Sequence, residues 1–239
     1  MVGETRQIDI APTIARILGF PFTCDGEPIE EILVFAGNSK RVSLIIVDSL
    51  GYEEYLNHRH LFSHLSAMEM RGLLFRCLSY SHLTTPSIAT ILCGLKPENH
   101  RILRTEDAYT KTIKCLPEVA YEYGFRVAIV MEEYGALSFY GLVNIVKPIT
   151  DRADIIEFDE ESCHNAAKVL KDLDPNLLIV HFRSLDKLGF NPEVVKHLDL
   201  MLERLFSSMR KNTLVLLCGD HPPHDRIDEE HVALIALKI

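Results

Sequence analysis

Five short runs of apolar residues most constrain what this chain can fold into. They span residues 42–47, 127–131, 177–182, 213–218 and 232–237. Val, Ile and Leu dominate these runs without alternation, which is typical of strands buried on both faces of a parallel sheet. Segments between the runs, such as 116–123 and 192–209, place apolar residues three and four positions apart, as amphipathic helices do. The order of the elements predicts an α/β fold with a mostly parallel central sheet and helices on both faces.

Size and charge narrow the class of protein. The chain has 239 residues, 47% of them hydrophobic, enough to bury a full core as one domain spanning 1–239. Its 34 Asp and Glu residues outnumber 25 Lys and Arg residues, so the clustered positive charge that a nucleic acid requires is missing. No apolar run reaches the roughly 18 residues of a bilayer span, and no apolar leader follows the first residues. We therefore expect a cytoplasmic protein that binds small ligands or metals, without a nucleic-acid or membrane partner, and that can form a homo-oligomer.

The six cysteines contain no C-x-x-C pair, which disfavours a zinc knuckle and a thioredoxin-type redox site. Most of them lie inside apolar runs, which predicts reduced and buried thiols. They are Cys24, Cys77, Cys93, Cys115, Cys163 and Cys218.

Acidic and imidazole side chains follow three of the predicted strands. Asp48 ends the first, Asp186 follows the run 177–182, and Asp220 and His221 follow the run 213–218. Any single carboxylate at such a place can be only a helix cap. Ligand sites in parallel sheets lie at the carboxyl ends of the strands, so three such ends together favour a site for Zn²⁺ or Mn²⁺.

A hydroxyl group precedes an apolar helical stretch at 88–92. Thr84 and Thr85 stand directly before Pro86, so either threonine can be the N-cap of a helix whose first residue is the proline. A helix N-terminus also stabilises an anion or a metal-bound alkoxide. The same hydroxyl is therefore a candidate nucleophile.

These segments together resemble the alkaline phosphatase superfamily, in particular its nucleotide pyrophosphatase/phosphodiesterase and phosphoglycerate-mutase-like branches. The residues that carry the resemblance are LIIVDSLGY, TTPSIATILCGLKPENH, the Leu-Asp pair after 177–182 and CGDH, in that order. The resemblance implies a three-layer sandwich with a metal-dependent active site.

Position by position, the resemblance makes Thr84 the attacking alkoxide beside a metal held by Asp48, Asp220 and His221. It implies one or two divalent ions, the second held by Asp186, a histidine four residues later and a histidine in the loop after CGDH. Position 190 is Phe190, which binds no metal. His224 suits the loop position better than His231, because His231 abuts the run 232–237. Lys187 can offset phosphate charge in place of the lost ion, although a solvated lysine is the simpler interpretation.

The N-terminal segment is in an unusual place for this superfamily. Residues 1–36, and 8–33 most closely, resemble a piece that lies near the C-terminus of superfamily members, yet here the segment precedes the first strand. A circular permutation explains this order and predicts that Met1 lies close to Ile239.

The resemblance implies hydrolysis of phosphate monoesters or diesters, with a small phosphorylated substrate. The sulfatase signature, in which a Cys precedes a Pro or Ala and then an Arg, is absent around Thr84. The alternative is a degenerate relative that keeps the fold as a binding or assembly module, for which Phe190 is the main support.

Overall fold

The central sheet of the computed structural model confirms the predicted α/β class. The structure describes residues 4–151 and 154–239, and within them one sheet has the strand order β1-β3-β8-β7-β2-β6-β4-β5. Most neighbouring pairs run parallel, and β8 runs antiparallel to both β3 and β7. The strands are β1 (Glu4–Arg6), β2 (Arg41–Val47), β3 (Leu73–Leu78), β4 (Val127–Glu132), β5 (Ile145–Ile149), β6 (Leu177–Phe182), β7 (Thr213–Gly219) and β8 (His231–Lys238).

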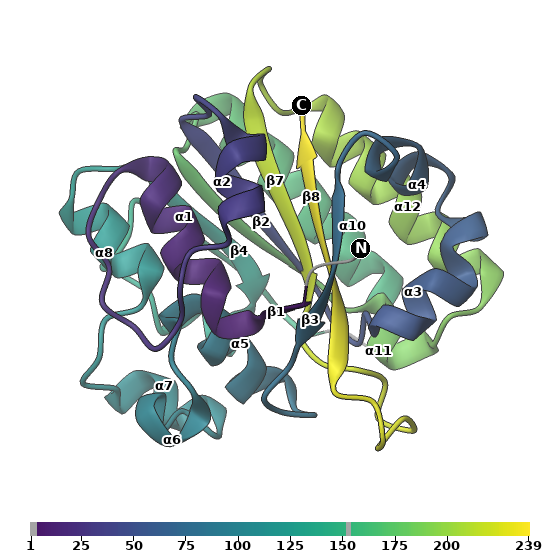
Figure 1. Cartoon of the computed structure of the whole chain (residues 1–239), viewed down its shortest axis with the longest axis horizontal. Coiled ribbons are helices and arrows are strands. Elements are labelled where there is room, and N and C mark those ends of the chain that lie inside the picture. Colours follow the sequence, from purple (N-terminus) through teal and green to yellow (C-terminus); the bar gives the residue numbers. More distant parts are fainter. Residues whose placement is uncertain (1–3, 152–153) are drawn as a thin grey trace.

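Helices cover both faces of this sheet, as Figure 1 shows. One face carries α1 (Ile10–Leu18), α2 (Glu30–Ala36), α5 (Thr84–Cys93), α7 (Thr105–Thr110), α8 (Leu116–Glu122) and α9 (Glu133–Leu137), with the short α6 (Pro97–His100) after α5. The other carries α3 (Tyr52–His58), α4 (Ser63–Glu69), α10 (Ile155–Asp172), α11 (Ser184–Leu188) and α12 (Pro192–Ser207). Two short 3-10 helices, η1 (Gln7–Asp9) and η2 (Arg59–Leu61), complete the described elements.

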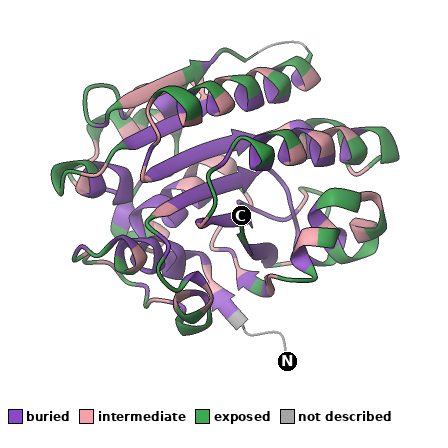
Figure 2. Ribbon diagram, turned by 90° about the horizontal axis from the view of Figure 1, so that it is seen from above, coloured by how far each residue is buried: buried purple, intermediate pink, exposed green. Residues whose placement is uncertain are grey.

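The central strands alternate between two cores. In β2, Leu44 and Ile46 pack into the core under α1, α2, α5 and α8, whereas Ile45 and Val47 pack into the core under α10 and α12. A strand buried on both faces needs no polar positions, which explains the uninterrupted apolar runs. Figure 2 shows the buried strands between helices whose outer surfaces are exposed.

The direction of β8 differs from the expectation that continuous apolar runs form parallel strands. Residues 220–230 join β7 to β8 and contain no helix. A parallel neighbour needs a crossover, usually helical, whereas a loop of this kind returns the chain in the opposite direction. The apolar pattern reports burial on both faces and is the same for either direction.

Two strands besides the short β1 are not among the five predicted apolar runs. In β3 an exposed Arg76 interrupts the pattern, and the edge strand β5 contains Lys147 and Pro148. Proline is tolerated at a sheet edge because its missing N–H faces away from the ladder. Both strands are recognisable only once their partners are known.

A glycine ends α1, the first α-helix of the chain. Helix α1 follows Asp9 and stops at Gly19, which adopts the left-handed conformation (φ 92°) that glycine tolerates best. Strands β1 and β8 flank the same strand, β3. Met1 lies outside the described residues, so the closeness of the two termini, and with it the circular permutation, stays a prediction.

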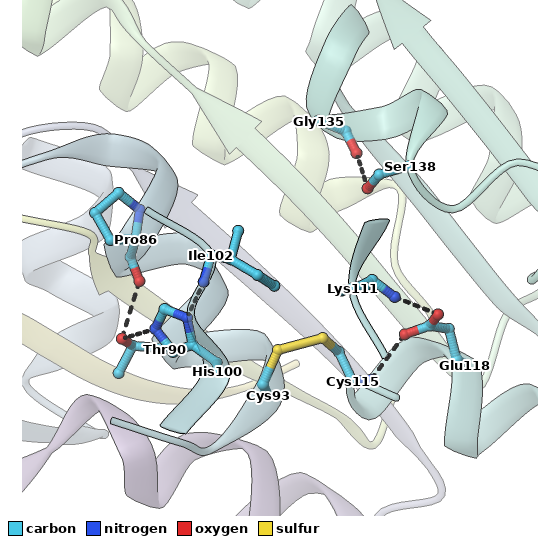
Figure 3. The surroundings of a disulfide bond; sticks show 10 residues. All are labelled: Pro86, Thr90, Cys93, His100, Ile102, Lys111, Cys115, Glu118, Gly135 and Ser138. Carbon is cyan, nitrogen blue, oxygen red and sulfur yellow. Dashed lines mark hydrogen bonds and ion pairs between the residues drawn. A yellow bond between two sulfur atoms is a disulfide. The ribbon is translucent and has the colours of Figure 1, made fainter. Parts of the chain in front are cut away.

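Two cysteines correct the expectation of reduced thiols throughout. Cys93, the last residue of α5, forms a disulfide with Cys115, which precedes α8, and Figure 3 shows this bond. The two residues are 22 positions apart, so no spacing motif reveals the pair. The packing of α5 against α8 brings them together. The expectation of burial is met by Cys77, Cys163 and Cys218.

A buried histidine next to the disulfide predicts an acid-sensitive stability. The backbone N–H of Ile102 donates to Nδ1 of His100 at 2.9 Å, so Nε2 carries the proton toward Thr90 Oγ1 at 3.1 Å (Figure 3). Burial lowers the pKa of His100 to about 4. The unfolded chain therefore binds a proton below pH 6.5 while the folded chain does not, and the free energy of unfolding falls as the pH falls from 6.5 toward 4.

The effect at pH 5 should be on the order of 1 kcal/mol for this one group. Urea unfolding at pH 7 and pH 5 measures it, with the His100→Gln variant as the control that cannot titrate. Equal pH dependence in the two proteins would show that His100 is protonated in the folded state as easily as in the unfolded chain.

Within the described parts of the chain, no helix has the length and apolarity to cross a bilayer.

Candidate metal and catalytic site

The sheet register brings the predicted carboxylates together. Strand β2 lies between β6 and β7, with Val47 opposite Gly219 on one side. The next residue on each strand is therefore Asp48 or Asp220, and both side chains lie at the carboxyl edge, essentially free of solvent exposure. His221 Nε2 lies 3.1 Å from Asp48 Oδ1 and 3.6 Å from Asp220 Oδ2.

Thr84 completes this cluster from the first turn of α5. Its Oγ1 lies 3.3 Å from His221 Nε2. The helix begins at Thr84 itself and its N-cap is Leu83, so the expectation that Pro86 is the first helical residue was wrong by two positions. Neither threonine hydroxyl caps the helix. The Thr85 hydroxyl instead pairs with that of Thr105 at 3.2 Å, away from the carboxylates.

Polar neighbours fix the orientation of the Asp220 segment. One carboxylate oxygen, Oδ1, accepts hydrogen bonds from the backbone N–H groups of Ser49 and His221, at 3.0 and 2.8 Å. Ser49 adopts the left-handed conformation (φ 62°), which is uncommon for serine. The Asp220 carbonyl accepts from Gln7 Nε2 at 2.5 Å and from Ser79 Oγ at 3.1 Å. The sequence contained no motif for Gln7 or Ser79, because both act through tertiary contacts.

The donor set fits a divalent cation. Among the described residues, both carboxylate oxygens of Asp48 and Oδ2 of Asp220 are buried without a hydrogen-bond partner. His221 Nδ1 lies 2.8 Å from the Pro222 carbonyl, which can only accept, so Nδ1 carries a proton and Nε2 faces the carboxylates. Ligand atoms of Asp48, Asp220 and His221 all lie within 4.8 Å of one another. Carboxylate oxygens and a neutral imidazole nitrogen are ligands that Zn²⁺ and Mn²⁺ accept.

The electrostatics of the metal-free cluster agree with this fit. Burial, and then the charge of Asp48, raise the pKa of Asp220 well above its usual value. Burial alone would lower the pKa of His221, but Asp48 and Asp220 outweigh it and raise that pKa to about 9. A proton on Nε2 therefore offsets the two carboxylates when no cation is bound. A divalent cation would take the place of that proton.

A second group of candidate ligands lies beside the first. Asp186 in α11 lies 3.2 Å from His224 Nε2, and Ser49 Oγ donates to Asp186 Oδ1 at 2.8 Å. Lys187 Nζ lies 2.9 Å from the other Asp186 oxygen, so this lysine is ion-paired and not simply solvated. Burial would raise the pKa of Asp186, but Lys187 and Ser49 outweigh it and lower that pKa.

The third ligand of this second group is not a histidine four residues after Asp186. Phe190 occupies that position, its ring 5.1 Å from the ring of His58. Phe190 lines the same cavity, of about 400 Å³, as Asp186 and His224. His231 begins β8 and belongs to neither group of ligands found among the described residues.

Two further residues, not predicted from the sequence, approach Asp48 from the end of β6 and the position directly after it. His181 Nε2 lies 3.7 Å from Asp48 Oδ2, and Arg183 Nε lies 3.8 Å from the same oxygen. Burial lowers the pKa of His181 to about 4, although Asp48 acts in the opposite direction. A histidine inside an otherwise apolar strand was the available signal. Arg183 also pairs with Asp151, from Nη1 to Oδ1 at 3.2 Å.

Several solved structures share this fold. Phosphonoacetate hydrolase from Sinorhizobium meliloti superposes with a TM-score of 0.64 at 14% identity, covering 77% of this chain and 57% of that chain. A 2-O GAG sulfatase gives a TM-score of 0.66 at 12% identity, covering 84% of this chain and 64% of its own. Murine ectonucleotide pyrophosphatase/phosphodiesterase 5 gives 0.59 at 16% identity, covering 76% of this chain and 57% of its own. At these identities the likeness concerns the fold, and the chain spans less than two thirds of the length of these relatives.

The Sulfatase family match, together with the fold shared with these neighbours, confirms the predicted relation to the alkaline phosphatase superfamily. No curated protein sequence matches the chain. The Sulfatase family profile matches residues 40–185, which include Asp48 and Thr84 and end just before Asp186. Because that match covers more than half of the sequence, the chain belongs to the Sulfatase family.

Proposed function

We propose that this chain is a metal-dependent hydrolase of phosphate monoesters or diesters, with Thr84 as its nucleophile. The observation that carries the proposal is the position of Thr84 Oγ1, 3.3 Å from a histidine nitrogen that two buried carboxylates surround. A hydroxyl is a weak nucleophile at neutral pH unless a neighbouring group or a metal removes its proton. The neighbours described above, which include a phosphonoacetate hydrolase and a sulfatase, support hydrolysis as the reaction class.

Asp48, Asp220 and His221 would hold the first ion, Zn²⁺ or Mn²⁺. When bound, such an ion lowers the pKa of a coordinated hydroxyl and polarises a phosphoryl oxygen. The cluster carries two carboxylates and therefore has the charge to hold a dication in a buried position.

The residues divide the remaining chemistry between two steps. Thr84 Oγ1 forms a bond to phosphorus while the bond to the ester oxygen breaks, and the alcohol leaves with a proton. Water then attacks phosphorus and the bond to Oγ1 breaks, so that phosphate leaves and Thr84 recovers its proton. Asp186 and His224, which lie 3.2 Å apart, would accept the proton of that water. Arg183 supplies a fixed positive charge beside the phosphoryl oxygens.

Hydrolysis of p-nitrophenyl phosphate and bis-p-nitrophenyl phosphate tests the proposal. We expect turnover that depends on added Zn²⁺ or Mn²⁺ and stops with a chelator, and the ratio of the two rates separates monoesterase from diesterase activity. Turnover that chelation leaves unchanged would contradict the proposal.

Phe190 supports a second candidate function, a binding or assembly module without catalysis. Its ring packs near His58 and offers no ligand beside Asp186 and His224. Metal content and turnover separate the two candidates. A protein that folds, binds no divalent ion and turns over neither ester is the module.

Replacing Phe190 with histidine should create the missing ligand. The variant places an imidazole in the cavity that Asp186 and His224 already line. We expect bound metal to rise from about one to about two equivalents per chain, because three protein ligands suffice for a catalytic zinc site. Elemental analysis after dialysis against a defined free Zn²⁺ concentration measures the change.

The Phe190→Leu variant is the control, since it removes the ring without adding a ligand. A metal content of about one equivalent in both variants would show that Asp186, His224 and an added imidazole do not form a second metal site.

A further inference from the structure

A cavity of about 270 Å³ opens beside Thr84. It runs along α5, and residues of α7 and α9 line its opposite side. Thr84 and Arg183 both line it, so the reacting hydroxyl and a positive charge stand at one part of its wall. A phosphoryl group bound beside Thr84 would therefore direct its organic substituent into this cavity.

Much of the cavity wall is apolar. Its aliphatic and aromatic lining side chains include Ile88, Leu92, Ile102, Met131 and Phe139. All five belong to, or pack against, the core on this face of the sheet. An apolar wall of this kind favours ligands that bury carbon rather than hydroxyl groups.

Several polar groups that line the cavity already have partners inside the protein. Lys111 forms an ion pair with Glu118, and the Ser138 hydroxyl donates to the Gly135 carbonyl, as Figure 3 shows. The hydroxyl groups of Thr85 and Thr105 pair with each other. A sugar in this cavity would give up hydrogen bonds to water without equivalent replacements.

Glu132, another lining residue, is likewise occupied. Its carboxylate accepts hydrogen bonds from the backbone N–H groups of Tyr134 and Gly135, at 3.0 and 3.1 Å, and so caps α9. Its role is to hold the helix that forms one wall.

Neighbouring residues fix the orientation of the Arg183 guanidinium group, which lines the cavity together with Thr84. The Arg183 side chain is only 13% exposed, because Asp48, Asp151 and the ring of Phe158 surround it. An arginine in such a setting matches the oxygens of a phosphoryl group better than a mobile lysine would. The cavity thus joins an anion-binding end to an apolar interior.

Large apolar side chains are also exposed at the protein surface beside the cavity. Tyr134 lines the cavity yet is 62% exposed, and the Tyr109 hydroxyl donates to the Tyr134 carbonyl at 2.6 Å, joining α7 to α9. Leu83, next to Thr84, is 58% exposed. Exposed apolar side chains beside a pocket are typical of a site for an apolar ligand.

We propose that this cavity binds the organic group of the substrate, and that the substrate class is the phosphate esters of aryl and arylalkyl alcohols. This inference rests on the proposed function only for the binding of the phosphate group. The binding of the organic group is argued from the residues that line the cavity. An apolar protein cavity of about 150 Å³ holds a benzene molecule. The cavity beside Thr84, at about 270 Å³, accommodates one substituted ring.

Binding of two phosphonates tests the cavity without any turnover. Benzylphosphonate and methylphosphonate carry the same anionic group, and their C–P bonds are not ester bonds. We expect the zinc-loaded protein to bind benzylphosphonate at least about 30-fold more tightly, because the ring is removed from water. Isothermal titration calorimetry measures both dissociation constants.

Filling the cavity should remove this preference. Ala108 of α7 lines the cavity and is half-buried, so Ala108→Phe should bring the ratio of the two affinities close to one. Ala167 of α10 is also half-buried but lies on the other face of the sheet, and Ala167→Phe is the matched control that should keep the full ratio. If Ala108→Phe fails to fold, Ala108→Leu and the ratio in the unaltered protein still test the inference.

A comparison of kcat/KM for two phosphate esters tests the same preference during turnover. Benzyl phosphate and glucose 6-phosphate both release a primary alcohol, so their kcat/KM values differ mainly through binding of the organic group. We expect benzyl phosphate to be preferred at least about tenfold.

The possible failures are distinguishable. Equal affinity for the two phosphonates, or no binding of either, overturns the inference even if p-nitrophenyl phosphate is hydrolysed. A preference for benzylphosphonate that Ala108→Phe abolishes supports the inference about the cavity even if no ester is turned over, in which case the proposed hydrolysis alone fails.

Discussion

Replacing Thr84 with alanine should lower the metal-dependent kcat for p-nitrophenyl phosphate by at least about a thousandfold, because the variant loses the hydroxyl that lies beside His221 Nε2. Thr84 Oγ1 is 3.3 Å from His221 Nε2, whereas the Thr85 hydroxyl faces Thr105. Thr84→Ser keeps a hydroxyl at the same position and should retain a measurable part of the activity. Steady-state kinetics at saturating Zn²⁺ or Mn²⁺ measures all three proteins.

Thr85→Ala distinguishes the two threonines. It removes a hydroxyl that does not reach the carboxylates, so kcat should fall by less than about tenfold. Circular dichroism and metal content should match the unaltered protein in every variant. A large loss of kcat in Thr85→Ala with little loss in Thr84→Ala would assign the nucleophile to Thr85.

Replacing Asp220 with asparagine should weaken binding of the first metal ion by more than about a hundredfold. Asparagine keeps an oxygen that can accept from the N–H groups of Ser49 and His221, so the local backbone should survive. The variant loses the charged oxygen that has no other partner among the described residues. Calorimetric titration with Zn²⁺ measures the affinity.

Although it weakens metal binding, the Asp220→Asn substitution should stabilise the metal-free protein. Burial and the charge of Asp48 raise the pKa of Asp220, so a charged Asp220 destabilises the metal-free fold at neutral pH. Asp220→Asn removes this charge and should raise the Tm measured with a chelator present. The increase in Tm on adding Zn²⁺ should shrink or disappear.

Asp228→Asn is the matched control, because Asp228 is exposed and belongs to neither ligand group. It should leave both the metal-free Tm and the shift caused by Zn²⁺ unchanged. An undiminished Zn²⁺ shift in Asp220→Asn would show that the ion binds elsewhere.

The sequence alone determined the class of fold and the edge of the sheet at which to look for chemistry. Strands buried on both faces are apolar throughout, so β2, β4, β6, β7 and β8 were recognisable as runs. Carboxyl ends of parallel strands meet at one edge, which is why Asp48, Asp220 and His221 could be grouped before any distance was known. The sequence carries this information because the pattern of apolar residues and the order of the elements along the chain are properties of the sequence itself.

Only the tertiary structure decided the direction of β8, the disulfide and the details of the site. The run 232–237 is equally apolar in either direction, and Cys93 meets Cys115 through the packing of two helices. The side-chain positions of Thr84, His181 and Arg183 around Asp48 likewise depend on contacts between distant segments. Such contacts arise where elements pack, and no spacing along the chain encodes them. The cavity beside Thr84 is the clearest case, because residues from three helices and two strands, and from the loops between them, line it.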